Sequence, residues 1–286
     1  MKSIFTLLFV VSFTLVKAQT SFQTEFQFLN YLINNHQLKE SEIEFNKLNF
    51  STYNSAQIDS LNYLWGWKNY SAKELESACS KWKKVSSKSS FYSKSKIFTA
   101  YNYTFLNHYD EADSLFKSML NDSSKLISTT AAFEISCIEL LKNNYSKFDS
   151  ITKTTDTTFY QLKLFQAEIS KIKKEKENLK MRSPIIAGAL SAVVPCLGKI
   201  YAHKPKQGIA LMLPMLMFGS VAYELYKKDG VESGSFISAA SVYTLFYIGN
   251  IVGSVFATKI SYHQKQHAIE NKILLNMHIP LRNIFN

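Results

Sequence analysis

The stretch that decides the fold is Ser183-Pro-Ile-Ile-Ala-Gly-Ala-Leu-Ser-Ala-Val-Val-Pro-Cys-Leu-Gly-Lys-Ile-Tyr-Ala202. It opens an apolar block that runs almost to Ala257, and it contains a Pro-x-x-Gly-Lys-x-Tyr break. Two apolar segments follow, Gly208 to Tyr226 and Gly234 to Thr258, and each is long enough to cross a hydrocarbon core of about 30 Å as a helix. The sequence therefore predicts a small helical transmembrane domain at residues 183–258, with about three membrane segments.

The first of these segments is the shortest. Between Pro184 and Tyr201 the chain can form a short span kinked at Pro195, or it can re-enter the membrane without crossing it, and we expect the kinked span. The break is interpreted as a membrane hinge formed by Pro195, Gly198, Lys199, Tyr201 and Gly208. Three spans after an exported first half would place residues 259–286 in the cytoplasm.

Residues 1–18 have the features of a secretory signal peptide. Lys2 precedes an apolar run from Ile4 to Val16, and the small residues Val16 and Ala18 form a cleavage site. An uncleaved membrane anchor is the alternative. A cleaved signal would export the domain that follows it. The predicted localisation is therefore a cell membrane, with several spans and an exported N-terminal domain.

Residues 19–158 are typical of helical hairpins, because Pro is absent and short polar clusters separate apolar-periodic runs. The sequence also shows a period of 34 residues, which is that of the tetratricopeptide repeat. Gly66 corresponds to Ala100, Ala78 to Ala112 and Trp82 to Phe116, and these residues with Tyr103 are expected to pack the repeats. The predicted fold is all-α, a tetratricopeptide-like helical solenoid followed by the transmembrane domain. An irregular helical bundle is the alternative.

The chain is basic, with a formal net charge of +11. Residues 159–182 are predicted to form a connecting helix that becomes strongly basic. Residues 259–286 are predicted to form a basic amphipathic tail, which Pro280 would end. Basic residues beside a membrane segment attract anionic headgroups, so membrane lipids are expected partners. Nucleic acid is not expected, because the chain is predicted to be exported and has no recognition motif.

Small residues recur in the last apolar segment at a spacing typical of close helix packing. Gly249 and Gly253 form a small-xxx-small face, and Asn250 between them is expected to hydrogen-bond to a neighbouring helix. The expected contact joins helices of one chain. The alternative is a contact between copies in a homo-oligomer.

The stretch from Arg182 to Tyr201 and the run from Phe246 to Ser254 together resemble a small bacterial membrane domain of unknown function. That domain is common in Bacteroidota-type envelope proteins, where it often follows a signal peptide and tetratricopeptide-like helices. The resemblance implies a location, the bacterial cell membrane with the exported N-terminal domain in the periplasm, and it implies an architecture. It implies no activity and no catalytic residue. One departure is Cys196, which stands where the family usually has Gly after the Pro.

No residue pattern in the sequence predicts catalysis, a metal site or a cofactor. His263 and His267 have the spacing of two zinc ligands on one helix face. However, Gln264 stands where the metalloprotease pattern needs a general base. The protein is therefore predicted not to be an enzyme, with a metal-dependent hydrolase as the alternative. The sequence leaves open whether Cys79 and Cys137 pair.

Helical solenoids bind peptides or proteins in a concave groove. The sequence therefore predicts a membrane-anchored scaffold of the cell envelope that recruits an unidentified envelope protein or peptide. The alternative is a component of an oligomeric membrane pore or transporter.

Overall fold

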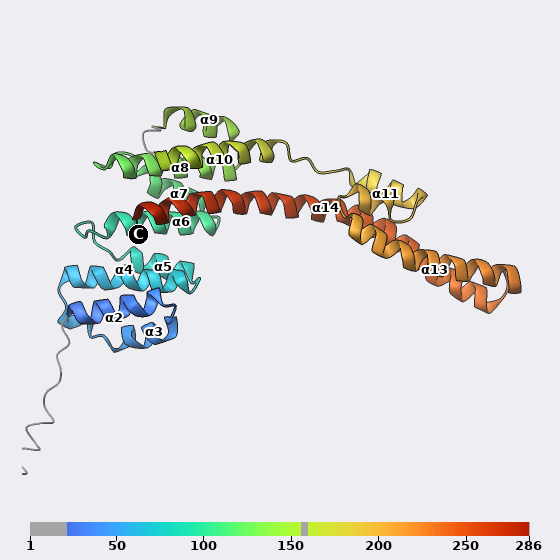
Figure 1. The fold of residues 1–286 in the computed structure, drawn as a ribbon, viewed down its shortest axis with the longest axis horizontal. Coiled ribbons are helices and arrows are strands. Elements are labelled where there is room, and N and C mark those ends of the chain that lie inside the picture. The colour runs from blue at the N-terminus through green and yellow to red at the C-terminus, as the bar shows by residue number, and fades with distance from the viewer. Residues whose placement is uncertain (1–21, 156–159, 286) are drawn as a thin grey trace, which may run out of the picture. The chain divides into compact units, whose positions relative to one another are not determined.

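The computed structural model describes residues 22–155 and 160–285, and this part of the chain is helical, with no strand. The expected all-α class is confirmed. The helices shown in Figure 1 are α2 Phe22–Asn34, α3 Leu38–Lys47, α4 Ser55–Ser71, α5 Leu75–Trp82, α6 Tyr92–Phe105, α7 Tyr109–Lys117, α8 Lys125–Leu141, α9 Tyr145–Thr154, α10 Tyr160–Glu177, α11 Pro184–Val193, α12 Leu197–Tyr201, α13 Pro205–Asp229 and α14 Gly234–Phe285. A short 3-10 turn, Phe50–Thr52, precedes α4. The predicted signal peptide at residues 1–18 lies outside the described residues.

The chain divides into two compact units. The first unit contains the residues up to Leu162 together with the end of the chain from Met277, and the second contains Lys163 to Asn276. The apolar block at residues 183–258 therefore belongs to the second unit. The last turns of α14 belong with the helices of the first unit.

In the first unit, each helix from α4 to α8 packs on the helix that follows it in the sequence. Three of the turns between these helices are alike, because Lys73, Asn107 and Asn143 each adopt a φ of 63° or 64° just after a helix. The next residue in each turn donates its backbone N–H to a carbonyl five residues back, in the pairs Glu74–Asn69, His108–Tyr103 and Asn144–Glu139. This is the Schellman helix ending, which satisfies carbonyls that a helix end leaves without partners. The three left-handed residues are 34 and 36 positions apart.

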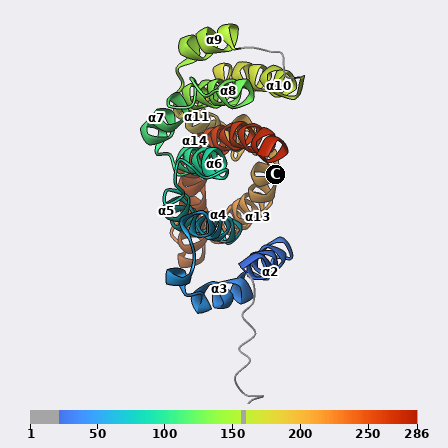
Figure 2. The ribbon, with the colours of Figure 1, turned by 90° about the vertical axis from the view of Figure 1, so that its left-hand side faces the viewer.

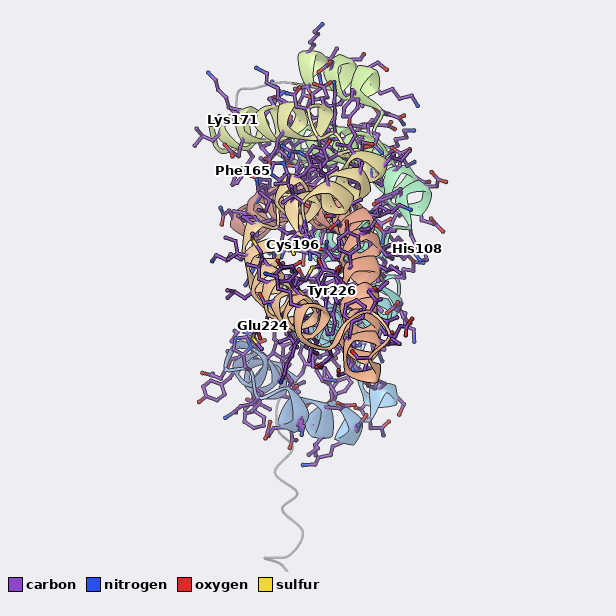
Figure 3. The ribbon with its side chains drawn as sticks, turned by 90° about the vertical axis from the view of Figure 1, so that its right-hand side faces the viewer. His108, Phe165, Lys171, Cys196, Glu224 and Tyr226 are labelled. Atoms are coloured by element: carbon purple, nitrogen blue, oxygen red, sulfur yellow. The ribbon has the colours of Figure 1, made fainter. Side chains whose placement is uncertain are left out.

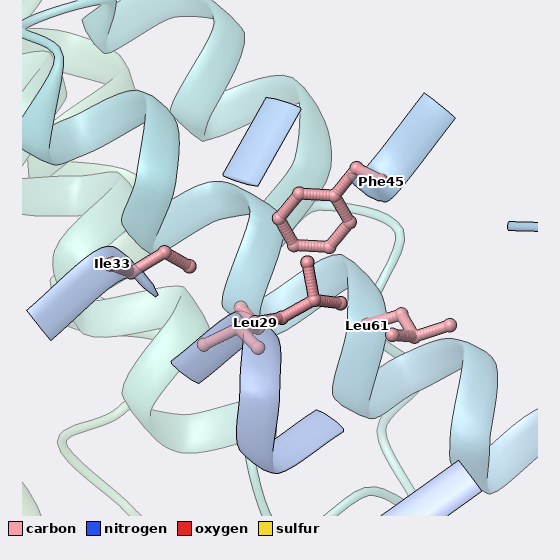
Figure 4. Packing of buried hydrophobic residues seen from close by; sticks show 5 residues of the cluster. Leu29, Ile33, Phe45 and Leu61 are labelled. Carbon is pink, nitrogen blue, oxygen red and sulfur yellow. The ribbon is translucent and has the colours of Figure 1, made fainter. Parts of the chain in front are cut away.

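Apolar side chains fill the space between these helices. Figure 4 shows the N-terminal part of this core, a cluster formed by Leu29, Ile33, Phe45, Leu61 and Leu64. Further along, α4 approaches α5 so closely that a Cβ at Gly66 would overlap the indole ring of Trp82. The indole Nε1 donates a hydrogen bond to the Tyr63 carbonyl at 3.0 Å. Glycine is therefore required at this helix crossing.

Two helices of the second unit, α13 and α14, are long and apolar enough to cross a membrane. Their most apolar windows have mean hydropathies of 1.6 and 1.4, yet only 17% and 6% of those windows are buried. The core helix of a soluble protein would bury most of such a window. The two helices touch where Gly219 meets the ring of Tyr243. Glu224 and Tyr226 lie toward the end of α13 (Figure 3), just before the turn to α14.

The short segment that precedes α13 folds back on itself. Arg182 Nη1 donates a hydrogen bond to the Tyr201 carbonyl at 2.6 Å, so the two ends of the segment meet. In addition, a Cβ at Gly198 would overlap the carbonyl oxygen of Ala187. Residues 187 and 198 would lie about 16 Å apart in a straight helix. The expectation of one kinked span from residue 184 to residue 201 is therefore wrong.

The backbone at Cys196 explains the reversal. α11 ends at Val193, and Cys196 then adopts a φ of 70°, the left-handed conformation, before α12 begins. This conformation costs an L-residue about 1–2 kcal/mol, and glycine adopts it without that cost. Cys196 is thus the residue at which the chain turns.

The part of α14 that follows the apolar block lies beside α10, the helix that precedes the block. Lys272 Nζ on α14 and a Glu175 carboxylate oxygen on α10 form an ion pair at 2.8 Å. α10 precedes the apolar block and this part of α14 follows it. The structure is therefore incompatible with the expected placement of residues 259–286 across a membrane from the residues before Ser183.

The helix of the tail also extends further than expected. α14 contains Pro280 and continues to Phe285, so the prediction that this Pro ends the helix is wrong. A Pro inside a helix costs about 3 kcal/mol. Met277 and Leu281, on either side of it, are completely buried, and burying two such side chains contributes a free energy of comparable size.

Candidate binding groove

A groove with a cavity volume of about 950 Å³ opens along α2, α4 and α6 of the first unit. These three helices follow one another in space (Figure 2), and each is the first helix of a pair. The wall of the groove is rich in aromatic residues, which are Phe26, Tyr63, Trp67, Tyr70, Phe91, Tyr101 and Phe105. Concave sites with apolar and aromatic linings are the usual form of a ligand site.

Ring contacts hold this aromatic wall in place. Tyr63 stacks on Phe91 with 4.3 Å between ring centroids. Trp67 meets the edge of Phe98 at 4.7 Å and the edge of Trp82 at 5.6 Å. Aromatic side chains with few torsions lose little entropy on binding, so a wall fixed by its own packing is suited to recognition.

The end of α14 supplies a further part of the groove. His278 Nε2 lies 2.7 Å from the Tyr70 hydroxyl, and the imidazole stacks on Tyr101 with 5.2 Å between centroids. Arg282, one turn further on, lines the groove itself. In Figures 1 and 2 the end of α14 lies beside α6. The C-terminal turns of the chain therefore complete the site.

The contact between His278 and Tyr70 joins two neutral groups. Burial, and secondarily the positive charge of Arg282, lower the pKa of His278 below its usual 6.5. Burial raises the pKa of Tyr70 to about 12, against a smaller opposing effect of Arg282. Burial also raises the pKa of Tyr101. At neutral pH, the imidazole is therefore uncharged and both hydroxyls keep their protons.

The charges that line the groove are basic. Lys73, Lys94 and Arg282 line it, and none of the described lining residues is acidic. Asn102 also lines it, but it is completely buried and its amide lies next to the Cys79 thiol, with which it interacts. The groove therefore offers positive charge beside an aromatic wall.

The residues predicted to pack the repeats lie in the core and not in this groove. Gly66, Ala78, Trp82, Ala100, Ala112 and Phe116 are buried, and Tyr103 is half-buried and stacks on His108. Sequence reasoning did not identify the groove residues. A signal was present, since Tyr63, Trp67 and Tyr70 recur on one helix face at the spacing i, i+4, i+7.

The predicted hinge residues all lie where α11, α12 and α13 meet. Pro195 lies in the turn between α11 and α12, Gly198 packs on α11, and Lys199 and Tyr201 belong to α12. Gly208 allows α13 to approach α12, because a Cβ there would lie 3.0 Å from Ile200. The predicted hinge is thus a tight junction of three helices.

The predicted packing face of α14 meets other helices only in part. A Cβ at Gly249 would have no atom within 4 Å, so the expected contact within one chain is not made there. A Cβ at Gly253 would lie 3.4 Å from the ammonium of Lys199. Asn250 is buried, but its amide has no hydrogen-bond partner within the described ranges. Ser254, one turn on, does reach α11 through the hydroxyl of Ser191 at 2.7 Å.

The three cysteines are free and buried. Burial raises the pKa of Cys79 to about 11, so its thiol stays protonated at neutral pH. In residues 22–155 and 160–285, no three His, Cys, Asp or Glu side chains are grouped so as to hold a metal ion. His267, from the His263–His267 pair, lies 3.3 Å from a carboxylate oxygen of Glu270.

Comparison with protein-family models, with curated proteins and with solved structures found no match for the chain.

Proposed function

We propose that the protein is a membrane-anchored helical-repeat scaffold of the bacterial cell envelope, and that its groove recruits an acidic, apolar peptide segment of another envelope protein. The observation that carries the proposal is the groove itself, with its fixed aromatic wall and its basic lining. Acidic side chains would complement Lys73, Lys94 and Arg282. Aromatic or aliphatic side chains would cover the rings.

The turns of the first unit support a repeat architecture. Lys73, Asn107 and Asn143 end the first helix of three successive pairs in the same left-handed conformation, at a spacing close to the repeat length of 34 residues. The proposed architecture is a tetratricopeptide-like solenoid, in which α2, α4, α6 and α8 form the inner face. Such solenoids place their binding surface on the concave face that the inner helices line.

The apolar block supports membrane anchoring by two spans. α13 and α14 would form a hairpin, and the segment from residue 184 to residue 201 would re-enter without crossing. The ion pair between Glu175 and Lys272 requires an even number of spans between them. The resemblance to Bacteroidota-type envelope domains and the signal-like residues 1–18 favour export of the first unit.

Labelling of single cysteines tests this topology in a variant that lacks the three native cysteines. Lys171→Cys, Lys265→Cys and Glu232→Cys place a thiol at exposed positions before, after and within the hairpin. A maleimide that cannot cross membranes should label the first two from the same side and the third from the other. Labelling of Lys171→Cys and Lys265→Cys from different sides would contradict the hairpin.

Site-specific photocrosslinking in intact cells tests recruitment. A benzoyl-phenylalanine at Phe105, which lines the groove, is compared with one at Phe28, which does not, and both side chains are 49% exposed. We expect a discrete adduct from position 105 only. Lys94→Glu should abolish that adduct, whereas Lys88→Glu, at an exposed position outside the lining, should not. Equal adducts at both positions, or indifference to Lys94→Glu, would refute recruitment by the groove.

A further inference from the structure

A second cavity lies in the second unit. It has a volume of about 280 Å³ and opens between α12, α13 and α14. Its lining combines the polar residues Lys199 and Asn250 with Gly249 and the apolar side chains of Leu211, Leu245 and Phe246. The cavity is open because Gly249 has no side chain and faces empty space.

Neither polar residue of this cavity has a side-chain partner among the described residues. Asn250 is 5% exposed, and neither atom of its amide has a hydrogen-bond partner among the described residues. Lys199 forms no ion pair within residues 22–155 and 160–285, and its ammonium lies over Gly253, one turn from Asn250. A buried amide without a partner is destabilising, and an ammonium without a counter-ion is free to bind an anion. The two groups therefore point to a ligand that would satisfy both.

The charge of that ligand follows from the distribution of acidic residues. Between residues 183 and 258 the acidic side chains are Glu224, Asp229 and Glu232. All three lie near the turn between α13 and α14, whereas Asn250 is about 24 Å along α14 from Gly234. No acid of the apolar block is therefore close to Lys199. The ligand has to bring the negative charge.

The apolar wall shows what else the ligand carries. Leu245 is 72% exposed, and Leu211 and Phe246 are also exposed. They continue the wall of the cavity onto the outer face of the hairpin, which would be in contact with lipid tails. A free anion would gain nothing from this surface, whereas an acyl chain would bury it.

We propose that this cavity binds an anionic phospholipid. Its phosphate would contact the Lys199 ammonium, the Asn250 amide would donate to a phosphate or ester oxygen, and one acyl chain would lie along Leu211, Leu245 and Phe246. Lys199 lies six residues before the first residue of α13, close to the membrane boundary expected there, which is the depth of a phosphate group. The inference rests on the membrane anchoring proposed above.

Native mass spectrometry of the full chain, delipidated in a neutral detergent, tests this site. The probes are phosphatidylglycerol and phosphatidylcholine with the same acyl chains, and inorganic phosphate alone. We expect phosphatidylglycerol to bind roughly tenfold more tightly than phosphatidylcholine, since one charge-assisted contact is worth about 1.4 kcal/mol. Lys199→Gln and Asn250→Leu should each remove that preference. Lys228→Gln, an exposed lysine at the far end of α13, should leave it unchanged.

Three outcomes would overturn the proposal. They are an absence of preference for phosphatidylglycerol, an equal loss in Lys199→Gln and Lys228→Gln, and displacement of the lipid by millimolar inorganic phosphate, which would identify a site for free anions. Circular dichroism of each variant confirms that the helices persist. A carbonate wash of membranes separates this inference from the anchoring. Release of the protein would refute the anchoring, whereas retention without lipid preference would refute only the lipid site.

Discussion

Replacing Gly66 by Ala should destabilise the first unit, although Ala favours helices. The new Cβ would overlap three atoms of the Trp82 indole. This ring is 2% exposed and is tied to the Tyr63 carbonyl by its Nε1, so it cannot rotate without breaking a buried hydrogen bond. Overpacking costs about 1–3 kcal/mol and the broken bond about 1–3 kcal/mol. The gain in helix propensity is about 1 kcal/mol, so the net loss should be ~3 kcal/mol.

Tryptophan fluorescence measures this loss in the intact protein. The chain has three Trp, at positions 65, 67 and 82, and all lie in α4 and α5. Urea unfolding in detergent, followed at the tryptophan emission, therefore reports only the first unit. With a slope of about 2 kcal/mol per molar urea, the midpoint should fall by ~1.5 M.

A second background tests the physical reason for the loss. The equivalent positions one repeat later are Ala100 and Phe116. There a residue larger than Gly is combined with a ring smaller than the indole of Trp. Trp82→Phe should therefore make Gly66→Ala nearly neutral, while Trp65 and Trp67 still report unfolding. An unchanged midpoint for Gly66→Ala alone would refute the reasoning. So would an equal loss in both backgrounds, because the loss would then not arise from the ring.

Three further predictions concern groups in both units. The pKa of His278 is lowered in the docked tail, so the undocked tail binds a proton more readily. Docking should therefore be complete above pH 6.5 and weaken as the pH falls below it. Amide hydrogen exchange of residues 277–283 should become faster at low pH, and His278→Gln should remove this pH dependence. Burial raises the pKa of Glu134 well above 4.5, and its carboxyl has no partner in the described residues. The folded state therefore loses stability as the pH rises above 4.5, because the buried carboxyl resists ionisation that the unfolded chain allows. Glu134→Leu should stabilise the first unit by about 1–3 kcal/mol at pH 8 and by less at pH 5, and an unchanged tryptophan-detected midpoint at pH 8 would contradict this. Gly198→Ala should separate α12 from α11, because the new Cβ would meet a backbone carbonyl; unaltered exchange at residues 184–201 would count against that contact.

The sequence was sufficient for the helical class and for the apolar hairpin, since both depend on local periodicity and composition. It also singled out Gly66 and Trp82 as packing residues, because a fixed repeat length brings equivalent residues to equivalent crossings. It was insufficient for the segment from residue 184 to residue 201. There the reversal depends on one left-handed residue, Cys196, whose side chain gives no indication of that conformation.

The groove was missed for a different reason. His278 and Tyr70 are 208 positions apart in the chain, and their contact depends on where the tail docks. No period or motif relates them. Propensity also misled at Pro280, where tertiary burial of Leu281 outweighs the tendency of Pro to end a helix. Long-range packing was thus the part of the structure that local patterns did not contain.

The hydrogen bond between Arg182 and the Tyr201 carbonyl has a consequence for how this protein can change over evolution. Because residues 183–200 begin and end at the same point, they form a closed excursion from the path of the main chain. Residues can be added or removed within such an excursion without shifting what comes before or after it, and lengthening a closed loop costs little. Insertions after Val194 should therefore be tolerated, whereas insertions within α13 would rotate every later residue relative to its neighbours.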